Sequence, residues 1–212
     1  RARALSPDTE PKHVVIVGAS FGGLATAREL AGDRGVTVTL IDFKTYFEYT
    51  PGVLRCLVEP SWLGQLSCPL PSSRNELLTA AMTGATSTSV VVREVAGGAE
   101  RKVPFDYLVL ATGSTYAAPI KPVQTEPSLA WRLATLTAAA AKLESASKVI
   151  VIGAGAVGVE LVGEILTVYP AKHVIVVDFA KTILPGFDAA ASTYTLEWLE
   201  RAGVELMLGE AI

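Results

Sequence analysis

The stretch VVIVGASFGGLATAREL, residues 14–30, joins a β-branched run, a glycine-rich turn and the start of a helix. The run at residues 14–17 is typical of a buried strand, which we expect to end at Gly18. An apolar helical pattern follows over residues 21–31, and residues 36–41 indicate a second buried strand. This order predicts a βαβ unit of about thirty residues.

The same order returns later in the chain, in VIVIGAGAVGVELVGEI, residues 149–165. Here we predict a strand over 149–152, a helix over 156–168 and a strand over 174–177. The duplication predicts an α/β fold with two Rossmann-like βαβ dinucleotide-binding units. The other predicted segments are loops with short helices at 46–71, an antiparallel meander at 87–92 and 101–104, strands at 107–110 and 204–208, and helices at 128–144 and 189–202.

The first glycine motif has the residue types that a pyrophosphate cradle needs. Gly18 permits a tight turn, and Gly23 lets the helix lie close to the strand. The helix N-terminus offers N–H groups to an anion, and Asp42, nineteen residues after Gly23, can accept hydrogen bonds from a ribose. Ser20 stands where the middle glycine is usual, and it is small enough to be tolerated. An ordinary strand-to-helix turn would also use glycines, so this alternative stays open.

The second glycine motif is complete. Gly153, Gly155 and Gly158 follow a predicted strand and open a predicted helix, and Asp178 comes twenty residues after the last glycine. An acid at this position favours NADH over NADPH, because a carboxylate repels the 2′-phosphate.

Composition excludes several function classes. The net charge is −3 without any Lys/Arg-rich run, which argues against binding to nucleic acid or to an anionic membrane. Residues 149–168, the longest apolar segment, include four glycines, Glu160 and Glu164, so we expect no transmembrane segment. Cys56 and Cys68 are twelve residues apart with no histidine nearby, and this spacing predicts neither a metal site nor a redox pair.

Four segments together resemble one family. VVIVGASFGG, YFEYTPGVLR (residues 46–55), FDYLVLATGS (residues 105–114) and VIVIGAGAVGVEL look like the flavoproteins with two dinucleotide-binding domains, the pyridine nucleotide-disulfide oxidoreductase superfamily. The resemblance is strongest to its branch of apoptosis-inducing-factor-like, ferroptosis-suppressor-like and type II NADH dehydrogenase-like proteins. It implies an NADH-binding domain inserted in an FAD-binding domain. The expected parts are a polar lead at 1–12, the first part of the FAD domain at 13–118 and an incomplete NAD(P)H domain at 119–212.

The resemblance also implies roles for individual residues. Thr50 and Pro51 would lie near the isoalloxazine ring, and Thr112 and Gly113 would form the loop where the chain leaves the flavin domain. Glu160 would face the place where nicotinamide and flavin stack, as a candidate catalytic residue; the alternative is an acid of the first helix turn, favoured by the dipole. The FAD-binding set would be Gly18, Ser20, Phe21, Gly22, Gly23 and Asp42, and the NADH-binding set Gly153, Gly155, Val157, Gly158 and Asp178.

The disulfide reductases of the superfamily carry a cysteine pair that this chain lacks. Electrons on the flavin would then leave to an external acceptor, and the resemblance points to a quinone-like molecule. The family's C-terminal return to the FAD domain is also missing. Two hypotheses follow: the N-terminal portion of an NADH:quinone-type flavin oxidoreductase, or a catalytically degenerate accessory or structural subunit of a larger organellar complex.

Two expectations concern the ends of the chain. A protein partner or the missing C-terminal half should cover the sheet edge at residues 204–208, because an open edge invites aggregation. The chain begins with Arg1, which fits removal of a targeting peptide or a start that lies outside this sequence. A mitochondrial, chloroplast or cytoplasmic location would be compatible with this start.

Overall fold

The computed structural model describes residues 10–70, 76–95, 97–116 and 118–210, so most of the expected polar lead lies outside the described residues. The chain divides into two compact units, one within residues 1–50 and 64–134 and the other within 51–63 and 135–212. The short segment 51–63 therefore packs with the C-terminal unit. The predicted division into an FAD domain and an NAD(P)H domain concerns ligand binding and stays a prediction.

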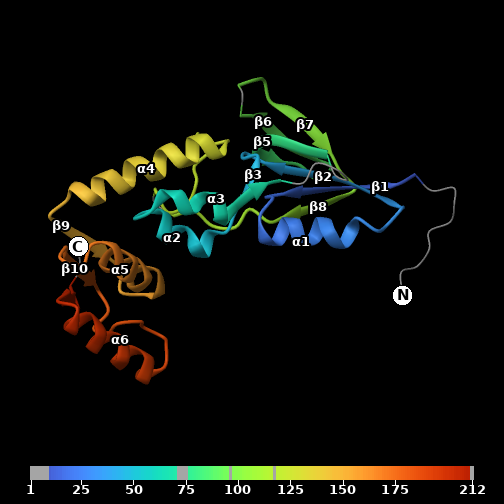
Figure 1. The fold of residues 1–212 in the computed structure, drawn as a ribbon. Helices are drawn as coiled ribbons and strands as arrows, with labels where there is room; N and C mark the ends of the chain where they lie inside the picture. The colour runs from blue at the N-terminus through green and yellow to red at the C-terminus, as the bar shows by residue number, and fades with distance from the viewer. Residues whose placement is uncertain (1–9, 71–75, 96, 117, 211–212) are drawn as a thin grey trace. The chain divides into compact units, whose positions relative to one another are not determined.

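The first unit is built on a six-stranded sheet of order β7-β6-β5-β2-β1-β8 (Figure 1). Strands β8, β1, β2 and β5 are parallel, and β5, β6 and β7 continue as an antiparallel meander. The strands are β1 (Lys12–Val17), β2 (Val36–Asp42), β5 (Glu76–Ala85), β6 (Ser89–Glu94), β7 (Arg101–Pro104) and β8 (Tyr107–Leu110).

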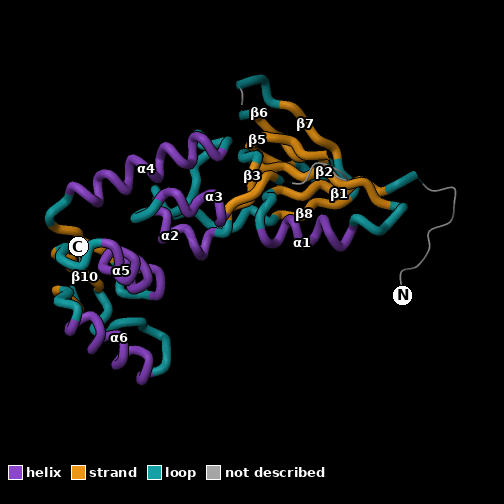
Figure 2. The backbone as a smooth tube through the Cα atoms, viewed as in Figure 1, coloured by secondary structure: helices purple, strands orange, loops and turns teal. Residues whose placement is uncertain are grey.

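Alternating residues of β1 supply the two faces of this sheet. Val14 and Ile16 pack in a core with Ala27 of helix α1 (Phe21–Leu30), which lies along one face (Figure 2). Val15 and Val17 belong to a second core that includes residues of β6 and β7. The sheet therefore curls so that its antiparallel part covers its own other face.

Short elements follow β2. They are β3 (Tyr46–Glu48), the 3-10 helix η1 (Thr50–Gly52), α2 (Val53–Cys56), the 3-10 helix η2 (Pro60–Trp62), α3 (Leu63–Leu66) and β4 (Ser67–Pro69). The predicted short helices are confirmed, and β3 pairs antiparallel with β4, which the sequence did not indicate. Helix α4 (Leu129–Ser145) leads into the second unit.

The second unit contains a parallel sheet of order β11-β10-β9. Its elements are β9 (Lys148–Ile152), α5 (Ala156–Val168), β10 (His173–Asp178), α6 (Ala189–Arg201) and β11 (Glu205–Leu208). Val151, Val162 and Leu199 pack in one core, to which the segment 51–63 contributes Val58. Both predicted βαβ units are thus confirmed.

Strands β9 and β11 are the edges of this three-stranded sheet. On β9, Ile150 and Ile152 are 57% and 74% exposed, although parallel strands are usually covered on both faces. The expectation that a protein partner or a C-terminal half covers the edge at residues 204–208 stays a prediction. No helix in the described part of the chain is both long enough and apolar enough to cross a membrane.

Candidate functional site

The turn after β1 requires glycine at Gly18. Its φ of +101° lies where side chains are rarely tolerated, and its N–H donates to the Ile41 carbonyl at 2.8 Å. A Cβ at Gly18 would lie 2.2 Å from the carbonyl oxygen of Ala111. The glycine turn and the loop of Thr112 and Gly113, after β8, are therefore in direct backbone contact.

Helix α1 starts against this turn with a free N-terminus. Ser20 is the N-cap, makes no side-chain capping bond, and accepts the first helical bond from Leu24 N at 2.8 Å. The first turn holds no acidic residue. Its N–H groups have no helical partner, so they can bind an anion. A Cβ at Gly23 would lie 1.7 Å from Gly18 O, whereas one at Gly22 would meet Ala111 Cβ at 3.7 Å.

The second unit repeats this construction. Gly153 has a φ of +108° and donates to the Val177 carbonyl at 2.8 Å. Gly155 is the N-cap of α5, and its carbonyl accepts the first helical bond from Val159 at 3.0 Å. A Cβ at Gly158 would lie 1.9 Å from Gly153 O. The two turns match residue by residue, with Ser20 at the place of Gly155.

Each predicted acid closes its own turn. Asp42 Oδ2 accepts from Ala19 N at 2.7 Å, and Asp178 Oδ2 accepts from Ala154 N at 2.6 Å. Both side chains are buried, in residues 8% and 9% exposed. A carboxylate has about four acceptor positions, so each acid retains capacity for ribose hydroxyls. This bracing role was not predicted from the sequence.

The two acids differ in their further partners. The Ala154 and Ala180 N–H groups hold the pKa of Asp178 below its ordinary value, so this carboxylate is ionised at neutral pH. Asp42 likewise accepts a backbone N–H two residues ahead, from Lys44 at 3.1 Å, but it also pairs with the buried Lys44 ammonium, whose Nζ lies 3.4 Å from Oδ2. Lys44 is a residue of this site that sequence reasoning missed, and only its position two residues after Asp42 could have indicated it.

Phe21 links the first glycine turn to the segment before Thr50. Its ring meets those of Phe47 and Tyr49 edge-on, at centroid distances of 5.2 and 5.9 Å. Thr50 ends the first-unit segment, and Pro51 begins the segment that packs with the second unit. The structure thus brings Gly18, Phe21, the Thr112 loop and the segment leading to Thr50 into one region of the first unit.

Glu160 lies in the second turn of α5, because the helix begins at Ala156. Its interpretation as a first-turn acid is therefore wrong, and the helix dipole has little effect at this distance. Glu160 is exposed, as is Val157 in the first turn. Glu164, one turn further, pairs with Arg55 of α2 at 2.7 Å, and this ion pair fastens segment 51–63 to α5.

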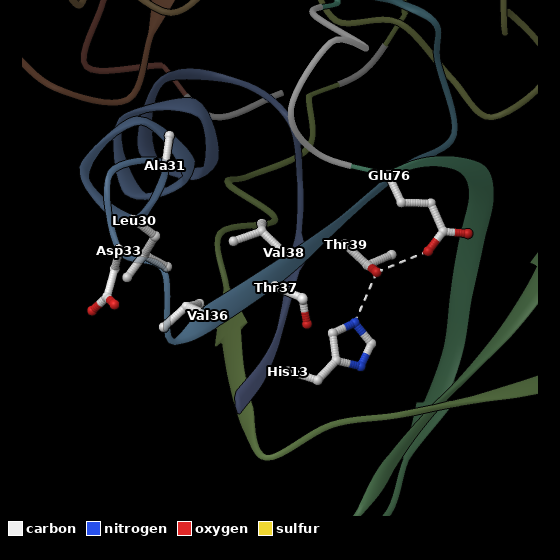
Figure 3. Close-up of a pocket in the computed structure, with 9 residues that line it drawn as sticks. All are labelled: His13, Leu30, Ala31, Asp33, Val36, Thr37, Val38, Thr39 and Glu76. Atoms are coloured by element: carbon white, nitrogen blue, oxygen red, sulfur yellow. Dashed lines mark hydrogen bonds between the residues drawn. The ribbon is translucent and has the colours of Figure 1, made fainter. Parts of the chain in front are cut away.

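A separate pocket of about 400 Å³ lies at the opposite, amino-terminal ends of the strands (Figure 3). There His13 Nε2 lies 2.8 Å from Thr39 Oγ1, which donates to Glu76 Oε2 at 3.1 Å. These two hydrogen bonds link β1, β2 and β5. The pocket adjoins neither glycine turn. Among the described residues, no cluster of His, Cys, Asp and Glu could hold a metal ion.

The model of the pyridine nucleotide-disulphide oxidoreductase family matches residues 12–212. The chain belongs to this family. Apoptosis-inducing factor homolog B of Dictyostelium discoideum is 27% identical, over 96% of this chain and 53% of that protein. Ferroptosis suppressor protein 1 of Mus musculus is 30% identical, over 98% and 55%. The chain thus spans about half the length of the curated relatives it matches.

Solved structures show the same fold. NDH2 from Plasmodium falciparum, solved in complex with NADH, has a TM-score of 0.75 and 18% identity, over 94% of this chain and 48% of that one. The mixed α/β fold of this family member therefore matches the Rossmann-like fold that the sequence predicted.

The residues present fit the dinucleotides that the family name implies. In each unit the last glycine of the motif, Gly23 or Gly158, lies so close to the carbonyl of the first that no Cβ fits, and this packing brings the helix N-terminus against the turn. In each, an acid-free helix N-terminus and a braced carboxylate flank the turn. Ser20, where the family motif has glycine, is the N-cap and leaves its backbone in this arrangement.

Proposed function

We propose that this chain forms the FAD-binding and NADH-binding parts of an oxidoreductase that transfers electrons from NADH through the flavin to a quinone-like acceptor. The observation that carries the proposal is the duplication of one glycine cradle, with the same backbone bonds and a bracing acid in both units. A bound flavin supplies hydride acceptance and onward electron transfer, which side chains cannot provide.

In the first unit, the FAD-binding set is Gly18, Ser20, Phe21, Gly22, Gly23 and Asp42. The first-turn N–H groups of α1 bind the pyrophosphate, and Asp42 accepts hydrogen bonds from the ribose. Thr50 and Pro51, with Thr112 and Gly113, flank the flavin. The backbone contact between Gly18 and Ala111 supports this placement, because it holds the Thr112 loop against the cradle.

In the second unit, Gly153, Gly155, Val157 and Gly158 bind the pyrophosphate of NADH, and Asp178 binds its ribose. Glu160 orients the nicotinamide. Its exposure on the second turn of α5, without an acid in the first turn, leaves it available to a ligand whose phosphates lie at the helix N-terminus.

Asp178 sets the preference for NADH. An ionised carboxylate in a buried position repels a 2′-phosphate, so NADPH should bind about tenfold more weakly or worse. Asp178→Ser should narrow the difference between the affinities for NADH and NADPH. Fluorescence titration with both nucleotides measures the ratio of the two Kd values.

Asp188→Ser is the matched control. Asp188 also accepts an N–H two residues ahead, from Ala190 at 2.8 Å, as Asp178 does from Ala180. Serine is also a good N-cap for α6, so this variant should keep the wild-type ratio. Equal affinities for NADH and NADPH in the wild type would contradict the assignment.

The acceptor is tested by steady-state turnover. A short-chain quinone should accelerate NADH oxidation, and a small disulfide should not, because Cys56 is buried, Cys68 is exposed and the two form no disulfide. Cys68→Ser should leave the quinone-dependent rate unchanged. Faster turnover with the disulfide than with the quinone would overturn the assignment. A protein that binds neither dinucleotide would favour an accessory subunit instead.

A further inference from the structure

Arg132, at the start of α4, is the centre of a buried polar network in the first unit. It has no exposed surface, and each of its five N–H donors has an acceptor. Nε donates to Glu48 Oε2 at 2.7 Å, Nη2 to Glu48 Oε1 at 3.3 Å and Ile120 O at 2.9 Å, and Nη1 to Pro119 O at 2.8 Å and Glu126 Oε2 at 3.4 Å. Only a planar guanidinium can satisfy this set.

The network costs desolvation free energy that an apolar core would not. The side chains of Glu48 and Glu126 are 1% and 7% exposed, so three charges are removed from water. Well-packed apolar side chains of the same volume are often as stable as such groups. The planar guanidinium of Arg132 instead gives a defined arrangement, because its five directional bonds fix three chain segments relative to one another.

Two of these segments lead directly to the proposed flavin site. Glu48 is the last residue of β3, and Thr50 follows two residues later. Pro119 and Ile120 lie on the segment that follows Thr112 and Gly113. That segment is held again where Lys121 Nζ donates to the Ser114 carbonyl at 2.6 Å.

A further contact joins the same two stretches of chain at the opposite end of β3. Thr45, immediately before β3, donates its backbone N–H to the carbonyl of Pro127 at 3.0 Å. The segments are thus fastened to each other before β3 by Thr45 and at its end by Arg132. Thr45 Oγ1 donates to the same carbonyl at 3.2 Å, so Thr45 reaches one acceptor, whereas Arg132 bonds five and is the buried side chain that joins Glu48 to the second segment.

We propose that Arg132 is a positioning residue of the flavin site: its buried fork holds the Thr50 segment and the Thr112–Gly113 segment at the spacing that FAD requires. The inference rests on the proposed function and deepens it. Among the described residues, Arg132 makes no hydrogen bond to the FAD-binding set, so it acts through Glu48 and through the carbonyls of Pro119 and Ile120.

The test uses Arg132→Lys in the full-length protein. Lysine keeps the charge but has three donors, so at least two acceptors lose their partner. After the flavin is removed, far-UV circular dichroism defines the temperatures at which the apoprotein is folded. Titration there, followed by quenching of flavin fluorescence, should give a Kd for FAD about tenfold weaker than wild type. A folded Arg132→Lys variant with the wild-type Kd would overturn the inference.

Two further variants keep the result interpretable. Tyr46→Phe is the control: Tyr46 lies on the same strand as Glu48, is 1% exposed, and its hydroxyl has no hydrogen-bond partner among the described residues. Its Kd for FAD should equal that of wild type. If Arg132→Lys does not fold, Glu48→Gln replaces it. Glutamine keeps the volume of Glu48 but removes its charge and replaces one of the two oxygens that accept from Arg132 by an NH2 group. It should therefore also weaken FAD binding, and an unchanged Kd would contradict the inference.

The wild-type titration separates this inference from the proposed function. A folded wild-type protein that does not bind FAD would defeat the proposed function. Wild-type binding that Arg132→Lys and Glu48→Gln leave intact would defeat only the role of Arg132.

Discussion

Gly158→Ala should disrupt the second unit, whereas Gly163→Ala, in the same helix, should stabilise it. A Cβ at residue 158 would lie 1.9 Å from the Gly153 carbonyl oxygen. Both groups belong to the backbone, so no side chain can move aside, and α5 would have to leave its place against β9. The expected loss in the free energy of unfolding is about 3 kcal/mol or more.

Gly163 is the matched control, because a Cβ there meets no described atom within 4 Å. Alanine in a helix interior is favoured over glycine by about 1 kcal/mol, so this variant should gain stability. Hydrogen–deuterium exchange of α5 peptides reports on this unit separately from the first. Wild-type protection of α5 in Gly158→Ala would show that the helix is not held against the turn as described.

Gly23→Ala should have a similar effect on the first unit. Its Cβ would lie 1.7 Å from Gly18 O and 3.4 Å from Ile16 Cγ2, so α1 would be pushed away from the turn and from the core of β1. We expect a loss of about 3 kcal/mol or more in the free energy of unfolding and, with the cradle opened, loss of flavin.

Gly22→Ala is the neighbouring control for the stability measurement. Its Cβ would meet only the Cβ of Ala111 at 3.7 Å, an ordinary contact. Exchange protection of α1 peptides should therefore fall sharply in Gly23→Ala and stay near wild type in Gly22→Ala. The reverse order would contradict the packing of α1 described above.

The two βαβ units could be predicted because their constraints are local. A glycine with positive φ, a second glycine under the helix and an acid at the end of the next strand occupy fixed positions in both stretches. Strand β5 could not be predicted in this way. Its sequence, ELLTAAMTGA, has little β-branched or aromatic character, and it is a strand because it pairs with β2 on one side and β6 on the other.

The site was predictable only in part, for the same reason. The spacing of Asp42 and Asp178 suggested ribose binding, but their bonds to Ala19 and Ala154 depend on the folded turn. Arg132 and Glu48 are 84 residues apart, and no local pattern relates them. The position of Glu160 also depended on where α5 begins, which sequence patterns define poorly.

The most direct test is the visible absorption spectrum of the natively isolated full-length protein, recorded without oxygen before and after one equivalent of NADH. The account predicts flavin bands that NADH bleaches and that a quinone then restores. A folded protein that shows no flavin bands, and acquires none when FAD is added, would contradict it.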